Sequence, residues 1–147
     1  MNIQSILEPS DDLKQQVLDR LRAFNHAANP SFYKKLEAPG SAMPLNLFAF
    51  HDDGTLAGGL LGKTQLAWLK TEILIVDERH RNSGIGKTLM QRAESEAMAR
   101  GCVHAYVDTM AWQARGFYEK LGYRVAGELP DWDSHGHSKY FLIKKMS

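Results

Sequence analysis

The sequence predicts a single α+β domain, residues 1–147, with a mixed but mostly antiparallel central sheet flanked by helices. Three observations predict this class. Two helical segments open the chain, a strand hairpin and a third apolar strand follow them, and helices then alternate with strands. A chain of 147 residues also suits one compact core.

A helix is expected first, between Ser10 and Asn29. Ser10 can cap the first turn, and the two aspartates after it suit the positively polarised end of a helix. Apolar residues then recur three and four positions apart, which places them on one side, and Asn29-Pro30 ends the helix. A short amphipathic piece over 32–36 precedes a loop.

Three strands are predicted next, over 45–51, 55–62 and 66–76, and the turn 52–54 joins the first two into a hairpin. The pair Gly58-Gly59 inside the second strand indicates a bulge or a close approach of the backbone. The run from Ile73 to Val76 is wholly apolar, so we expect its side chains to be buried on both faces of the sheet.

The second half of the chain alternates between helices and strands. A polar loop over 79–84 leads into a helix that Gly101 ends, and a buried strand over 103–108 follows. The span between this strand and the previous one is long enough for a right-handed parallel crossover. A shorter helix over 111–120 ends at Gly122, and the loop 129–139 joins two late strands, 123–128 and 140–144.

Composition excludes several classes of protein. Hydrophobic residues make up 44% and charged residues 24%, which rules out a disordered chain. The net charge of +1 gives no electrostatic footprint for nucleic acid or an anionic membrane. The single cysteine, Cys102, excludes a disulfide framework, and no apolar run is long enough to span a bilayer. The first residues do not resemble a signal peptide, so we expect a cytoplasmic protein.

The most informative segment is the loop over 81–88, between a buried strand and a helix. Backbone N–H groups at a helix start have no intrahelical acceptor, and glycines let that backbone approach a phosphate closely. Arg81 and Lys87 add positive charge beside Gly84 and Gly86. We therefore expect an anion site here. Its candidate residues are Arg81, Asn82, Ser83, Gly84, Ile85, Gly86 and Lys87.

Two common phosphate loops fit this segment incompletely. A nucleotide P-loop would end in Gly86-Lys87-Thr88, but Arg81 occupies its first glycine position. The dinucleotide fingerprint would use Gly84 and Gly86, but Leu89 stands where its third glycine should be. A small P-loop-like nucleotide phosphotransferase remains an alternative interpretation of these residues.

A third pattern is complete. Arg81-x-x-Gly84-x-Gly86 matches the Arg/Gln-x-x-Gly-x-Gly/Ala signature that binds the pyrophosphate of acyl-coenzyme A. The segment 114–123, with its Phe117-Tyr118 pair, is similar to the second signature of the same proteins. On these residues the sequence, over roughly 45–145, resembles the GNAT superfamily of acetyltransferases.

The resemblance implies the acyl-coenzyme A N-acyltransferase fold and acetyl-coenzyme A as acyl donor, with no metal. The implied reaction is direct acetyl transfer to a primary amine of a small molecule, peptide or protein. The resemblance is compatible with a homodimer and implies neither a nucleic-acid nor a membrane partner. A non-catalytic acyl-coenzyme A-binding module with the same fold is a second alternative.

The resemblance also assigns residues to the donor. The backbone of Leu74, Ile75 and Val76 would hydrogen-bond the pantetheine arm, and an N–H near Ile75 or Val76 would face the thioester oxygen. Many family members have an asparagine where this chain has Ala111. Gln113 is the nearby residue whose amide would replace it.

Two residues are the catalytic candidates. By the resemblance, Tyr118 is the general acid that protonates the departing thiolate. Glu72 is the candidate base, because strand alternation places it on one face with Leu74 and Val76, at the start of the strand.

The remaining polar residues give weaker signals. His26, His51, His80 and His104 show no metal-ligand spacing, and we expect them at the surface or in packing contacts. The loop over 131–137 holds acids, histidines and a tryptophan. It is expected either as a solvated loop or as an acceptor mouth that favours a cationic amine.

Overall fold

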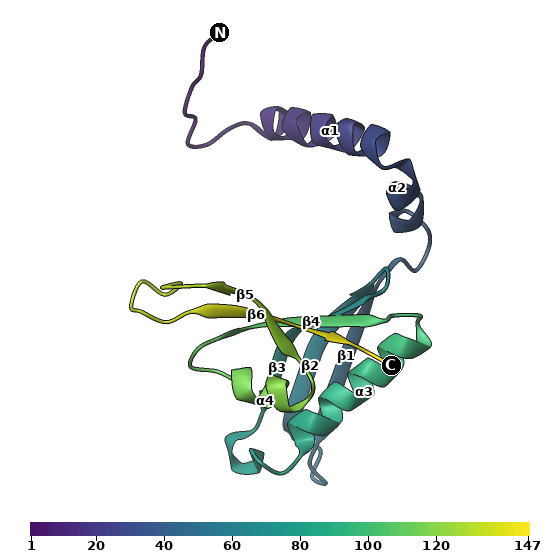
Figure 1. Ribbon diagram of the computed structural model, residues 1–147, viewed down its shortest axis with the longest axis vertical. Coiled ribbons are helices and arrows are strands. Elements are labelled where there is room, and N and C mark those ends of the chain that lie inside the picture. The colour runs from purple at the N-terminus through teal and green to yellow at the C-terminus, as the bar shows by residue number, and fades with distance from the viewer. The chain divides into compact units, whose positions relative to one another are not determined.

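The computed structural model describes residues 1–147 and divides them into two compact units, residues 1–38 and residues 39–147 (Figure 1). No helix in either unit has both the length and the apolar character needed to cross a membrane.

The first unit holds two helices, α1 (Asp11–Ala28) and α2 (Pro30–Leu36). The predicted Ser10 cap is confirmed, because its hydroxyl oxygen accepts a hydrogen bond from the Leu13 N–H at 3.1 Å. Asn29 ends α1, and its side-chain oxygen caps α2 through the Phe32 N–H at 3.1 Å. Local capping signals therefore fix this pair of helices.

The second unit is built on a six-stranded sheet with the strand order β1-β2-β3-β4-β6-β5. Only β3 and β4 are parallel, and every other pair of neighbours is antiparallel. The mixed, mostly antiparallel sheet that the sequence predicts is thus confirmed. The strands are β1 (Ala42–Phe50), β2 (Leu56–Gln65), β3 (Trp68–Val76), β4 (His104–Met110), β5 (Arg124–Leu129) and β6 (Lys139–Lys145).

Three helical segments connect the strands. A 3-10 turn, η1 (Glu78–His80), and the helix α3 (Ile85–Ala99) lie between β3 and β4, and α4 (Arg115–Lys120) lies between β4 and β5. The helix α4 begins four residues later than predicted. The reason is a braced turn after β4, in which the Gln113 side-chain oxygen accepts the Met110 N–H at 2.7 Å.

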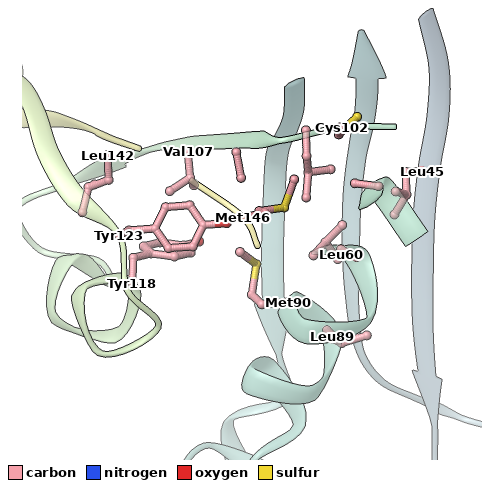
Figure 2. Close-up of a cluster of buried hydrophobic side chains, with 14 residues drawn as sticks. Leu45, Leu60, Leu89, Met90, Cys102, Val107, Tyr118, Tyr123, Leu142 and Met146 are labelled. Carbon is pink, nitrogen blue, oxygen red and sulfur yellow. The ribbon is translucent and has the colours of Figure 1, made fainter. Parts of the chain in front are cut away.

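The core lies between α3 and one face of the sheet (Figure 1). Met90 of α3 and Leu60, Leu69 and Leu142 of the sheet are each 0% exposed. Figure 2 shows the rings of Tyr118 and Tyr123 within this cluster, close to Val107. Its buried members are Leu45, Leu60, Leu69, Leu89, Met90, Ala93, Ala97, Cys102, Ala105, Val107, Tyr118, Tyr123, Leu142 and Met146.

One carboxylate is buried with this cluster. Glu94 of α3 is 8% exposed and accepts hydrogen bonds from the Tyr123 hydroxyl at 3.1 Å and the Lys144 ammonium at 2.7 Å. Burial, and then the Glu94 charge, raise the pKa of Tyr123. Both oxygens of the buried acid therefore have partners.

The end of β3 differs from the prediction. Ile73 and Ile75 are 53% and 55% exposed, whereas Leu74 packs against the core, so burial on both faces is wrong. In the second unit, α3 covers only one face of this part of the sheet. The apolar run therefore gives one half-buried side and one exposed side.

A β-bulge at Glu72 determines which side chains at the end of β3 are exposed and which pack against the core. Thr71 is opposite Gly62 and Ile73 is opposite Leu61, so Glu72 has no partner in β2. An extra residue in one strand shifts the alternation of all side chains after it. As a result, Leu74, rather than Ile73, follows Thr71 on the face that packs against α3.

The Gly58-Gly59 pair brings β2 close to β3. A Cβ atom on Gly58 would lie 2.9 Å from the backbone oxygen of Ile75, a distance that no side chain tolerates. The predicted close approach of the backbone is confirmed.

Candidate active site

The parallel strands β3 and β4 separate partway along their length. They pair from Trp68–His104 to Thr71–Val107 and no further. Beyond that point β3 pairs with β2 alone, and β4 pairs with β6 alone. We call the separated segments, residues 72–76 of β3 and 108–110 of β4, the β3–β4 split. In the split, β3 presents an unpaired backbone edge.

The direction of the free backbone groups follows from one hydrogen bond. The Asp77 N–H donates to the Ala57 oxygen of β2 at 2.7 Å. Because successive N–H groups of a strand point to opposite sides, the N–H of Ile75 also faces β2, while those of Leu74 and Val76 face the split. Of the three predicted donor-binding residues, Leu74 and Val76 therefore offer N–H groups to an extended ligand, and Ile75 does not.

The loop after β3 leads to a helix start without a side-chain cap. Gly84 is the N-terminal cap of α3, with φ of +88°, and has no side chain to accept an N–H. The first intrahelical bond is from the Thr88 N–H to the Gly84 oxygen at 2.9 Å. The N–H groups of Ile85, Gly86 and Lys87 are consequently without intrahelical acceptors, which is the arrangement of an anion site.

Charge around this loop favours the same ligand. Arg81 and Lys87 form no ion pair, so both cations are available beside the free N–H groups. Asn82 adopts a left-handed backbone with φ of +67°, which turns the chain into α3. The Ser83 hydroxyl donates to the His80 oxygen and so supports η1 rather than α3.

Gly86 brings three elements of the site together. A Cβ atom there would lie 3.3 Å from Phe117 Cζ of α4 and 3.5 Å from Val76 Cγ2 of β3. The first turn of α3 therefore packs directly on the end of β3 and on α4. This contact places the anion loop, the β3–β4 split and the residue next to Phe117, which is Tyr118, in one region.

Tyr118 is buried in α4, with 5% exposure, and its ring packs edge-on against Phe117 and Tyr123. Its hydroxyl forms no hydrogen bond, in contrast to that of Tyr123. Burial, and then the carboxylate of Asp108 at the split, raise the pKa of Tyr118 to about 12. The phenol is therefore protonated across the neutral range and has a proton available for a hydrogen bond.

Glu72 lies at the bulge, where β3 leaves β4. Its carboxylate is 43% exposed and lies 3.3 Å from the Lys63 ammonium of β2. The expectation that it shares a face with Leu74 and Val76 is wrong, because the bulge shifts the alternation. Lys63 and Leu61 are exposed on the sheet face opposite α3, and Glu72 lies with them.

Gln113 does not replace the missing asparagine with its oxygen. That oxygen accepts the Met110 N–H at 2.7 Å and the Thr109 hydroxyl at 3.2 Å, and so braces the turn before α4. Only its amide NH₂ group is left as a donor for a ligand.

A groove of about 470 Å³ lies on the other side of α3, against β1. It shares Ser83, Gly84, Ile85 and Thr88 with the loop over 81–88 but includes no residue of β3 or β4. It is therefore separate from the β3–β4 split. Its other lining residues are Leu47, Phe48, Ala49, Leu89 and Arg92.

The loop over 131–137 uses its carboxylates internally. Asp133 accepts the N–H groups of His135 at 2.9 Å and His137 at 3.0 Å, and the His137 ring lies 2.6 Å from its second oxygen. Asp131 accepts the Gly136 N–H at 2.7 Å. Both acids already have partners, so the loop fits the solvated interpretation better than an acceptor mouth.

The expected packing contacts include one between His51 and His80, whose ring centroids lie 4.6 Å apart. His51 and His80 are not isolated, because the pairing of β1, β2 and β3 brings them together with Asp77. Their separation along the chain hides this grouping from any motif of fixed spacing.

The sheet order, the β3–β4 split and the uncapped helix start define the class of the protein: this is the fold of the GNAT acetyltransferases. A crystal structure of an acetyltransferase from Bacillus cereus has the same fold, with a TM-score of 0.80 and 26% identity, covering 97% of this chain and 98% of that one.

The comparison of sequences agrees. Blasticidin-S acetyltransferase of Streptomyces morookaense is 37% identical over 134 residues, which cover 88% of this chain and 98% of that protein. An acetyltransferase of Agrobacterium fabrum is 41% identical over 102 residues, 69% of this chain and 74% of that protein. Residues 11–123 match the Acetyltransferase (GNAT) family. The chain belongs to the GNAT family of acetyltransferases, and the match begins in α1, earlier than the resemblance in the sequence alone.

Proposed function

We propose that this acetyltransferase moves an acetyl group from acetyl-coenzyme A directly to a primary amine of a small molecule. The observation that carries the proposal is the position of the β3–β4 split. Its free backbone edge ends at the uncapped, positively charged start of α3. An extended arm that ends in a pyrophosphate is the ligand that fits both features.

The donor would be held mainly by backbone. The N–H groups of Leu74 and Val76 would bond the pantetheine arm as a neighbouring strand does. The N–H groups of residues 85–87 would bind the pyrophosphate, with Arg81 and Lys87 neutralising its charge. When bound, acetyl-coenzyme A supplies the thioester carbonyl and a thiolate leaving group.

The reaction requires two proton movements. The amine nitrogen bonds to the thioester carbon and the C–S bond breaks, so the amine loses a proton and the sulfur gains electron density. Glu72 would accept the amine proton, directly or through water, since its carboxylate is solvated at the edge of the split. Tyr118 would transfer its hydroxyl proton to the departing sulfur and regain a proton from water, so that the products are the amide and the free thiol. No covalent enzyme intermediate is needed.

The acceptor class rests on a relative. The Streptomyces morookaense relative is a blasticidin-S acetyltransferase, and this chain covers nearly all of that protein. We therefore propose a small-molecule amine, and blasticidin S is the first compound to test. Peptide and protein amines form the comparison set.

Because the family match starts in α1, we propose that residues 1–147 act as one domain. A cytoplasmic location and a homodimer remain predictions.

The test has two stages with the purified chain. Calorimetry with acetyl-coenzyme A, and with ATP–Mg²⁺ as control, identifies the donor; binding of ATP–Mg²⁺ alone would replace the proposal with a phosphotransferase. Thiol release and mass spectrometry of the product then follow with blasticidin S, an amine panel and peptides. Donor binding without product from any amine would mean a binding module, and product from peptides alone would overturn the small-molecule acceptor.

A further inference from the structure

Three side chains with metal-binding groups meet beside the anion loop. They are His51, which follows β1, Asp77, which follows β3, and His80 at the end of η1. One ligand atom from each lies within 4.8 Å of the other two. None of the three takes part in the acetyl transfer proposed above.

Backbone hydrogen bonds hold all three residues in place. The His51 N–H donates to the Thr55 oxygen at 2.8 Å, which closes the turn after β1. The Asp77 N–H donates to the Ala57 oxygen of β2 at 2.7 Å, and the His80 N–H donates to the Asp77 oxygen at 2.8 Å. The three side chains therefore start from positions that the sheet and η1 fix relative to one another.

The His51 ring has an unsatisfied nitrogen that points into this cluster. Its Nε2 atom is enclosed and has no hydrogen-bond partner, and no other enclosed side-chain nitrogen or oxygen lacks one. Asp77 Oδ2 lies 3.6 Å from it, which is ion-pair distance for a protonated imidazole but beyond hydrogen-bond range. The His80 ring lies 4.6 Å away between centroids. A buried polar atom without a partner calls for a missing ligand.

We propose that His51, Asp77 and His80 bind a divalent transition-metal ion of the zinc type, with water in the fourth position. Two imidazoles and one carboxylate are a donor set that such ions use, at about 2.0–2.2 Å for each bond. Tetrahedral geometry with these bonds separates donors by about 3.3 Å. The His51–Asp77 pair needs a closure of only a few tenths of an ångström from 3.6 Å.

Arg79 is the competitor for the carboxylate. Its guanidinium lies 3.2 Å from Asp77 Oδ2 and is 80% exposed, so a metal ion must displace it or share that oxygen. The Arg79 backbone N–H also donates to the other carboxylate oxygen, Asp77 Oδ1, at 3.2 Å. A substitution that removes the Arg79 guanidinium leaves the Asp77 carboxylate in place and removes a positive charge from the site.

The site would link three segments next to the anion loop. His80 directly precedes Arg81, and the Ser83 hydroxyl donates to the His80 oxygen. A bound ion would therefore tie the turn after β1 to the start of the loop that we assign to the pyrophosphate. Its role is structural, and it supplies no step of the acetyl transfer.

The test titrates metal-free full-length protein with Zn²⁺ by calorimetry and with Co²⁺ by visible absorption. We expect one Zn²⁺ per chain, a Zn²⁺-dependent rise in Tm, and a Co²⁺ spectrum of nitrogen and oxygen ligation. His51→Gln and His80→Gln should each weaken Zn²⁺ binding at least tenfold. His137→Gln, which removes the histidine of a different His–Asp pair, should leave it unchanged.

Arg79→Gln protects the test against variants that fail to fold, because it should tighten Zn²⁺ binding several-fold. Misfolding cannot produce that gain. The proposal is overturned if Zn²⁺ does not bind, if His51→Gln and His80→Gln bind it as the parent does, or if binding is lost in His137→Gln. Acetyl-coenzyme A binding is measured separately, so failure of the metal site leaves the proposed function untouched.

Discussion

The hydroxyl of Tyr118 separates catalysis from stability more cleanly than any other atom of the site. Tyr118→Phe removes an oxygen that has no hydrogen-bond partner and leaves the packed ring in place. Since no partner is left unsatisfied, we expect the free energy of unfolding at pH 7 to change by less than about 1 kcal/mol. Loss of a proton donor at the sulfur should lower turnover by about 10²-fold, with a smaller change in donor affinity.

The pH dependence of stability gives a second readout of the same hydroxyl. Its pKa is about 12 in the folded protein, against 10 in an unfolded chain. Between these values the unfolded chain has released the proton and the folded chain has kept it, so stability falls as pH rises. A difference of two pKa units corresponds to a loss of unfolding free energy of at most about 2–3 kcal/mol. Parent protein should therefore lose more unfolding free energy than Tyr118→Phe between pH 10 and 12, measured by urea denaturation.

Tyr123→Phe is the matched control. Its hydroxyl donates to buried Glu94 at 3.1 Å, so its loss should cost about 1–3 kcal/mol of unfolding free energy. Turnover should stay at the parent level after correction for the folded fraction. Parent-like turnover in Tyr118→Phe, or an equal loss of turnover in both variants, would refute the acid role and make Tyr118 a packing residue.

Three further variants test the loop, the base and the packing between them. Gly84→Val places a branched side chain at φ of +88°, where the left-handed backbone costs about 1–2 kcal/mol, and should abolish acetyl-coenzyme A binding in a folded protein; unchanged calorimetric affinity would exclude the loop. Glu72→Gln should remove the low-pH limb of the pH–rate profile, and a parent-like profile would assign Glu72 only its ion pair with Lys63. Gly86→Val should cost about 1–3 kcal/mol by overpacking against Phe117, measured by urea denaturation. Gly116→Ala, with open space at its Cβ, is the control, and an equal cost there would contradict the contact.

Signals that act within a few residues could be read from the sequence. Ser10 and Asn29 cap α1 and α2 through their own side chains, and Gly101 and Gly122 adopt φ above +90° where helices end. The anion loop belongs with them, because its glycines and its position between a strand and a helix are all local. These features give the elements, their order and the family.

Features that depend on pairing between strands could not be read in the same way. The bulge at Glu72 exists only relative to β2, so a pattern of alternation in β3 alone gives the wrong face for every residue after it. His51 and His80 meet because β1 and β3 both flank β2. The turn before α4 depends on the hydrogen bond from the Met110 N–H to the Gln113 side chain. The helical spacing of apolar residues over 111–120 does not indicate this bond.

The bulge also explains how one strand serves two chemical requirements. The proposed base must exchange protons with water, whereas the backbone that we propose to bind the donor must keep its N–H groups free of water and supported by a core. Thr71 is the last residue of β3 to pair with β4, and Glu72 is the bulge. The shift in alternation places the Glu72 carboxylate on the exposed face beside Lys63, and returns Leu74 to the face packed against α3. Regular pairing would place Glu72 and Leu74 on the same face. The solvated carboxylate and the supported backbone edge can therefore lie two residues apart because β3 has one residue more than β2 at this point.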